Sequence, residues 1–263
     1  VLKLSGNAAD NAQLVFLGAA ADAMGLNTID TTAVDGSDTV ALRLASMSNA
    51  LTIDTGAGSD DIVLGSGGSV VDSGNGNDAI TVGAANDGVH DDHITSGDGN
   101  DLVMVLDAQL SSHLQIDAGN GVDALVLESD ATVVDADFTL LTNLEQVVFD
   151  VDALDNAQSI TVAALAAAAG VDRIDAHFAG GTVHFKAGTH AGVADYQGVG
   201  GEVDGFGQVH PAKDDAGVGR GRAQGHGHLD AAVQTDAGSA NQGLERALSQ
   251  HCKYLKMVGN GAL

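Results

Sequence analysis

The stretch LTIDTGAGSDDIVLGSGGSVVDSGNGNDAITV, residues 51–82, holds one nine-residue pattern twice, as TGAGSDDIV (55–63) and SGNGNDAIT (73–81). Each copy reads x-G-x-G-x-D-x-U-x, where U is a large apolar residue. The pattern returns as SGDGNDLVM (96–104) and AGNGVDALV (118–126). Each copy predicts a tight glycine turn followed by a short strand, and four copies in succession indicate a repeat architecture.

The spacing of the four motif aspartates predicts how the repeats stack. Asp60, Asp78, Asp101 and Asp123 lie 18, 23 and 22 residues apart. Eighteen residues make two nonapeptides, or one coil, and the longer spacings fit a coil that carries a small loop insertion. The positions two and four residues after each aspartate, and seven before it, are all aliphatic. They are Ile62, Leu64, Ile80, Val82, Val103, Val105, Leu125, Leu127, Ile53, Val71, Ile94 and Ile116.

Rows of aliphatic residues that stack on themselves form the core of a solenoid. The predicted fold class is therefore all-β, a right-handed parallel β-roll or β-solenoid with short helical insertions and a poorly ordered C-terminal tail. Absence of Trp, with only 2 Tyr and 6 Phe, suits the narrow interior of such a fold. One short helix is expected at AAADAMG (19–25), where Gly25 would form the C-terminal cap.

The chain divides into four zones. Residues 1–50 form an N-terminal solenoid flank, 51–127 the glycine/aspartate array, 128–204 a second flank, and 205–263 a tail that is expected to be disordered or of separate origin. The flanks are related, because residues 11–32 align without gaps on 156–177 and nine of the 22 positions are identical. Such internal duplication is typical of repeat proteins.

The net charge of -26 restricts the possible partners. It argues against nucleic acid and anionic lipid as partners and favours cations. No apolar stretch is long enough to span a membrane. A single cysteine, Cys252, excludes an internal disulfide, and nothing resembles a nucleophile elbow or a phosphate-binding loop, so no enzymatic activity is expected.

Stacked turns would place like carboxylates about 5 Å apart, where two of them repel by roughly 3 kcal/mol at an effective dielectric constant near 20. A hard dication that takes 6–8 oxygen ligands from carboxylates and carbonyls would relieve this repulsion. Calcium suits such a site better than magnesium, which requires octahedral geometry and holds its water. We expect two to four calcium ions.

The repeat resembles that of the repeats-in-toxin (RTX) calcium-binding β-roll family of bacterial secreted, surface-layer and adhesin-type proteins. The resemblance implies export by type I secretion, folding on external calcium, and ligands from the motif glycine carbonyls and aspartates. These are Gly56, Gly58, Asp60, Gly74, Gly76, Asp78, Gly97, Gly99, Asp101, Gly119, Gly121 and Asp123. Asp54, Asp72 and Asp117, which precede three of the turns, are further candidate ligands.

The sequence departs from the family pattern in two ways. The first motif glycine is replaced by Thr55, Ser73, Ser96 and Ala118. The intervening half-coils, for example GSGGSVV (65–71), lack an aspartate at the motif position, so one side of the roll is expected to bind calcium and the other not. His90-Asp91-Asp92-His93 (90–93) is expected to form a solvated polar loop rather than a transition-metal site.

The functional hypothesis is a calcium-binding structural module of a bacterial secreted or cell-surface protein that folds or assembles on binding extracellular calcium. Self-association or a cell-surface polysaccharide would be possible further partners. The alternative is a C-terminal RTX accessory or secretion domain of a secreted enzyme whose catalytic domain lies outside this chain.

Overall fold

The computed structural model describes residues 1–6, 12–34, 36, 38–83, 90–106, 109–128, 132–149, 158–176, 183–187, 195–198, 202–203 and 208–210. All of them belong to one compact unit, Val1–Ala231, and a second unit, Ala232–Leu263, lies outside the described residues. The predicted tail, 205–263, also lies outside them apart from strand β21, Gln208–His210, at its start.

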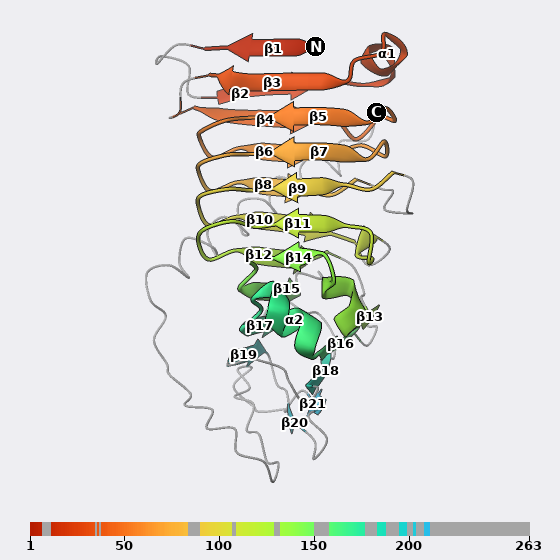
Figure 1. Cartoon of the computed structure of the whole chain (residues 1–263), viewed down its shortest axis with the longest axis vertical. Coiled ribbons are helices and arrows are strands. Elements are labelled where there is room, and N and C mark those ends of the chain that lie inside the picture. Colours follow the sequence, from red (N-terminus) through yellow and green to blue (C-terminus); the bar gives the residue numbers. More distant parts are fainter. Residues whose placement is uncertain are drawn as a thin grey trace, which may run out of the picture. The chain divides into compact units, whose positions relative to one another are not determined.

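Two parallel sheets form the body of this unit (Figure 1). In spatial order, the seven-stranded sheet contains β1 (Leu2–Ser5), β3 (Thr28–Ala33), β5 (Leu51–Asp54), β7 (Ser69–Asp72), β9 (His93–Thr95), β11 (Gln115–Asp117) and β14 (Leu141–Thr142). The nine-stranded sheet contains β19 (Asp195–Gly198), β17 (Arg173–Ala176), β15 (Gln146–Phe149), β12 (Ala124–Leu127), β10 (Leu102–Val105), β8 (Ala79–Thr81), β6 (Asp61–Val63), β4 (Thr39–Arg43) and β2 (Ala12–Phe16).

From β1 to β12 the chain alternates between the two sheets, and every neighbouring pair within them is parallel. This arrangement is a parallel β-solenoid, as predicted. A third sheet of five strands contains β13 (Thr132–Val133), β16 (Gln158–Val162), β18 (Val183–Ala187), β21 and β20 (Glu202–Val203), and β21 pairs antiparallel with both of its neighbours. A 3₁₀ turn spans Asp135–Phe138.

The predicted core is confirmed in full. Ile62 pairs with Ile80, and Val103 lies between Ile80 and Leu125, so each aliphatic row stacks on itself. All twelve predicted core residues are at most 3% exposed. Since each coil covers the apolar side chains of the one before it, burial depends on the stack and not on any single coil.

The solenoid has two unlike corners where the chain passes between the sheets. The motif corner consists of the turns 55–60, 73–78, 96–101 and 118–123, which Figure 1 shows as a series of matching arcs. The opposite corner consists of the connections 64–68, 82–92 and 106–114, of which 84–89 and 107–108 are not described. The predicted loop insertions all fall at the opposite corner, which keeps the motif turns in register.

The duplication of the flanks is visible as a repeated strand–helix–strand unit. Strands β2 and β3 flank α1 (Ala19–Ala23), and β16 and β17 flank α2 (Ala164–Ala169). Both helices end at a glycine in the left-handed region, Gly25 at φ 71° and Gly170 at φ 105°. In both, the residue after the glycine donates its N–H to the carbonyl five positions back. This is the Schellman cap, and it confirms the predicted helix end.

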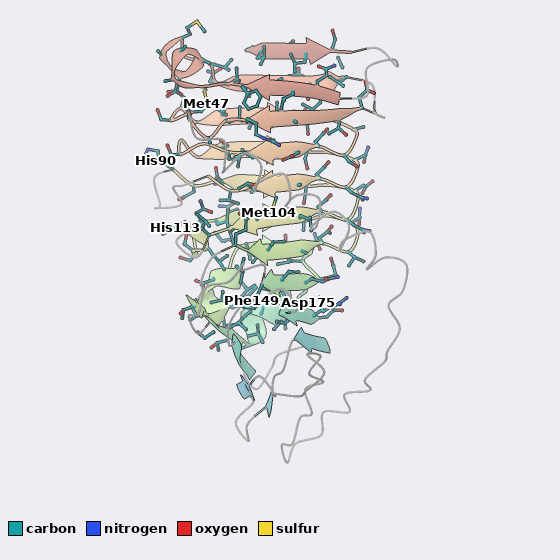
Figure 2. All side chains as sticks on the ribbon, turned by 180° about the vertical axis from the view of Figure 1, so that it is seen from behind. Met47, His90, Met104, His113, Phe149 and Asp175 are labelled. Carbon is teal, nitrogen blue, oxygen red and sulfur yellow. The ribbon has the colours of Figure 1, made fainter. Side chains whose placement is uncertain are left out.

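Three strands of the nine-stranded sheet are buried on both faces. The outward side chains of β10, β12 and β15 include Leu102, Met104 (labelled in Figure 2), Val126 and Val148. Each of the four is no more than 2% exposed. On β6 and β8 the outward residues stay partly exposed. Strands that are apolar at consecutive positions are those that bury both faces. No helix in the described ranges is long and apolar enough to cross a membrane.

Candidate functional site

Glycine shapes the motif corner because successive turns pack backbone against backbone. The eight motif glycines all have positive φ, between 89° and 154°. A Cβ on Gly76 would lie 1.8 Å from the carbonyl oxygen of Gly58, and one on Gly121 would lie 1.5 Å from that of Gly99. Both the dihedral angle and the close approach therefore require glycine.

Backbone hydrogen bonds tie each motif turn to the next. Asn75 donates its N–H to the carbonyl of Gly56 at 2.8 Å, and Gly58 donates to the carbonyl of Asn75 at 2.9 Å. The same pair of bonds recurs one coil further on, at Gly74, Gly76 and Asp98. The carbonyls of Gly56, Gly74 and Gly97 thus point along the stack. Each keeps a second lone pair that remains available to a cation.

The motif aspartates form a column in this corner, which we call the aspartate column: Asp60, Asp78, Asp101 and Asp123. The Oδ1 of each member accepts the backbone N–H of the residue at the same position in the preceding coil, at 2.8 Å in all four cases. The four residues are only 1–2% exposed. The unequal spacings of 18, 23 and 22 residues therefore still place one aspartate in each of these four coils.

The other carboxylate oxygen of each column member has no partner. The Oδ2 atoms of all four residues are buried and accept no hydrogen bond. The three Lys and Arg side chains that pair with aspartates in the described part of the chain bind Asp30, Asp61 and Asp175, outside the column. A buried carboxylate without a compensating charge is costly, so this column needs a source of positive charge.

The electrostatics of the column agree with that requirement. Burial raises the pKa of Asp78 and of Asp101 to about 7, and that of Asp123 to about 6. Burial also raises the pKa of Asp60. The negative charges of column neighbours add to the rise, as Asp78 and Asp123 do for Asp101. The backbone N–H bonds oppose the rise but do not cancel it. Without a metal, the column therefore takes up protons near neutral pH.

A second column explains why the first motif glycine is absent. The hydroxyls of Thr55, Ser73 and Ser96 are buried and donate to the carbonyl of the equivalent residue in the next coil, at 3.0 to 3.1 Å. The same hydroxyls lower the pKa of the aspartate of their own turn. Ala118 provides no hydroxyl, so Asp123 lacks this contact.

The three further candidates form a separate column. Asp54, Asp72 and Asp117 lie on the outer face of the seven-stranded sheet, with Thr95 completing the row. Their side chains alternate with the core residues of the strands and are partly or fully exposed. Burial and the charges of Asp72 and Asp30 raise the pKa of Asp54. The strand pleat therefore directs these carboxylates away from the core side on which the aspartate column is buried.

Sequence reasoning missed two acidic residues in the motif corner. Glu145 continues the column, because its Oε2 accepts the backbone N–H of Asp123 at 2.8 Å. Its distance of 22 residues from Asp123, equal to the previous spacing, was the available signal. Asp38 is 1% exposed and also has an unpartnered Oδ2. Its backbone stacks on Gly58, two residues before the motif aspartate, although Asp38 precedes Asp60 by the same 22 residues that separate Asp101 from Asp123.

The opposite corner corrects two predictions. Asp92 is fully buried, so the loop 90–93 is not a solvated polar loop at this residue. Its Oδ1 accepts the N–H of Ser69 at 2.8 Å and its Oδ2 that of Gly83 at 3.2 Å. Asp92 also lies two residues before the core residue Ile94, so one intervening half-coil does carry an aspartate at the motif position. Backbone amides that must be satisfied inside the corner explain why this aspartate is buried.

The histidines at and beside this corner stay at the surface. His90 and His93 are exposed, and His113 Nδ1 lies 3.9 Å from Asp91 Oδ2. Figure 2 shows His90 and His113 on the side of the solenoid that carries these irregular connections. The residues stacked with Asp92, Ser69 and Leu114, bear no charge. Asp92 is thus a single carboxylate whose two oxygens are both occupied by backbone amides.

Within the described ranges, no three His, Cys, Asp or Glu side chains gather closely enough to hold a metal ion by themselves. An ion in the aspartate column would instead combine the carboxylates of two adjacent coils with backbone carbonyls, a donor set that calcium accepts. Comparisons with protein-family models, with curated proteins and with solved structures found no match.

Proposed function

We propose that this chain is a calcium-binding structural module whose ions are held along the aspartate column. One observation carries the proposal: four stacked aspartates each bury an Oδ2 atom that accepts no hydrogen bond. The corner supplies no cationic side chain to these atoms. A row of divalent ions would neutralise the carboxylates and would also bind the two lone pairs left free on each Oδ2.

The donor set favours calcium over other cations. Carboxylate and carbonyl oxygens are hard ligands, and the column contains no imidazole or thiolate that would favour zinc or copper. Magnesium needs octahedral geometry at short distances and keeps several waters, which does not suit a buried row of backbone and carboxylate oxygens. The resemblance to the RTX repeat supports the same choice.

Calcium would act on this chain by stabilising the stacked coils. Each ion that binds only the folded form contributes about 2.7 kcal/mol when calcium exceeds its Kd a hundredfold. Extracellular calcium modules work at Kd values of about 10⁻⁴–10⁻³ M, so the folded form would depend on calcium outside the cell. We place the chain in a bacterial secreted or cell-surface protein, as a structural module without catalytic activity of its own.

The test compares the aspartate column with the outer column. Circular dichroism and thermal unfolding of the full chain would be followed while calcium, and separately magnesium, is added to metal-free protein. We expect calcium to raise the Tm strongly and magnesium weakly. The double variant Asp78→Asn/Asp101→Asn should lose most of the calcium response, whereas the matched double variant Asp72→Asn/Asp117→Asn should keep it. An unchanged Tm on adding millimolar calcium would contradict the proposal.

A further inference from the structure

The hydrogen-bond pattern of the aspartate column does not end with the last motif. The N–H of Asp123 donates to Glu145 Oε2 at 2.8 Å, as the N–H of Asp101 donates to Asp123 Oδ1 at 2.8 Å. The strands that follow stay in register, since Ala124 pairs with Leu102 on one side and with Gln146 on the other. Glu145 therefore occupies the motif-aspartate position of the next coil.

The turn that carries Glu145 is unlike the motif turns. Asp117 pairs with Thr142 and Ala124 pairs with Gln146, so the residues 143–145 replace the six residues 118–123. Asn143, at φ 56°, adopts the left-handed conformation that the glycines provide elsewhere. With a shorter turn, the backbone at Glu145 cannot follow the path of a motif turn. The extra methylene of Glu lets its carboxylate reach the same backbone N–H.

We propose that Glu145 closes the calcium column, so that Asp123 and Glu145 together hold one further ion in the gap after the last motif turn. This inference rests on the proposed function. Asp123 is 1% exposed, and its buried Oδ2 accepts no hydrogen bond. The other members of the aspartate column have the same unpaired atom. Glu145 contributes the second carboxylate that the other gaps obtain from a motif aspartate.

The other end of the column provides an internal contrast. Asp60 Oδ1 accepts the N–H of Val40, so the position before the first motif aspartate is held by an apolar residue. The hydrogen-bond pattern of the aspartate column thus begins at Val40, which has no carboxylate, and ends at Glu145, which has one. The inter-coil hydrogen bond needs only a backbone N–H at Val40 but an acceptor side chain at 145, and the neutral amide of Gln would accept that bond as well as Glu145 does. A ligand role accounts for the negative charge.

Native mass spectrometry of the full 263-residue chain in calcium tests this inference by counting bound ions. The variant Glu145→Gln keeps a carbonyl oxygen that can accept the N–H of Asp123 but removes the charge. We expect it to bind one calcium fewer than the wild type, with an unchanged β signal in circular dichroism. Glu128→Gln, the same substitution at the end of β12, should bind the wild-type number. An equal count in Glu145→Gln and wild type would overturn the inference.

The outcomes separate this inference from the proposed function. If the wild type binds no calcium, the proposed function fails and the inference with it. If the wild type binds calcium and Glu145→Gln binds as much, only the inference fails. Should Glu145→Gln not fold, Glu145→Asp keeps the charge with a shorter reach. Its weakest calcium site should then be about tenfold weaker by calorimetry. A wild-type isotherm for Glu145→Asp would overturn the inference.

Discussion

The two corners of the solenoid solve the same problem of stacking in opposite ways. At the motif corner, four turns of equal length place an aspartate in every coil, and each keeps one buried oxygen unpaired. At the opposite corner the connections differ in length, and the one buried aspartate among its described residues, Asp92, accepts backbone N–H groups with both oxygens. The same residue type thus has both carboxylate oxygens paired at the opposite corner and one oxygen unpaired at the motif corner.

This difference shows what separates a cation site from a structural carboxylate in a repeat fold. A lone aspartate can be neutralised in effect by two or three backbone N–H groups. A column cannot, because each turn offers its neighbour a single N–H while adding a full charge. Repetition, and not the aspartate itself, therefore leaves the column with uncompensated negative charge.

The largest effect is expected from a methyl group in the motif corner. Gly76→Ala would place a Cβ 1.8 Å from the carbonyl of Gly58, at a φ of 136°. We expect a loss of about 4 kcal/mol or more in the free energy of unfolding, or no folded protein. Gly25→Ala, at φ 71° with no atom within 4 Å of the new Cβ, should cost only about 1 kcal/mol. Urea unfolding in saturating calcium measures both, and equal losses would refute the proposed close packing.

Matched Asp→Asn variants at the two corners should change stability in opposite directions. Asp92→Asn replaces an acceptor by an NH₂ group that faces a backbone N–H, so it should cost about 1–3 kcal/mol with or without calcium. Asp78→Asn removes one charge from the column, so it should stabilise the calcium-free protein by about 1–3 kcal/mol and reduce the gain on adding calcium. Denaturant unfolding in both conditions gives the two signs. The same sign for both variants without calcium would contradict the distinction.

The raised pKa values predict an unusual pH dependence for the calcium-free protein. Asp78 and Asp101 have pKa values of about 7 in the folded chain, above the ordinary value of 3.8. Between these values the folded state holds more protons than the unfolded state, so stability falls as pH rises from about 4 to about 7. Thermal unfolding in calcium-free buffer should show a falling Tm over this window, and saturating calcium should flatten the curve near neutral pH. A Tm that rises over the window without calcium would contradict this prediction.

The smallest effects concern the hydroxyl column. Ser73→Ala and Ser96→Ala each remove one buried hydrogen bond to the next coil, so each should cost about 1 kcal/mol. Loss of the hydroxyl should also raise the pKa of the neighbouring column aspartate, since the hydroxyl lowers it. Chemical unfolding and NMR titration measure the two effects. Ala118→Ser, which adds the missing hydroxyl, is the reciprocal control and should lower the pKa of Asp123.

Much of the fold follows from sequence spacing alone. Residues at fixed offsets from each motif aspartate have one environment when the coils repeat, so the core rows around Ile62 and Ile80 could be named in advance. The helix end at Gly25 was also predictable, because its cap depends on a glycine at one position. The duplicated unit was predicted as a sequence repeat, but not that β16 and β2 belong to different sheets, since strand position depends on the coils around each copy.

The rest depended on three-dimensional context. Glu145 lacks the glycines of the motif, so pattern matching passes over it, and only register reveals its place. Asp92 is part of a polar tetrapeptide in the sequence, yet it is buried because its carboxylate accepts the backbone N–H groups of Ser69 and Gly83. Burial of Leu102 and Met104 on the outer face of their sheet depends on what lies against that face, which the spacing of the repeats does not specify.

The inter-coil hydrogen bonds allow such an array to change in length by whole coils. Every carboxylate of the column accepts the backbone N–H of the coil before it. Each of these joints between coils therefore involves only two neighbouring coils, and the same hydrogen bond forms at each joint. Removal or insertion of a whole 18-residue period, such as 61–78, would leave every surviving joint intact. Gene copies that differ by such periods would therefore encode proteins that fold by the same rule and, under the proposed function, differ mainly in how many ions they hold.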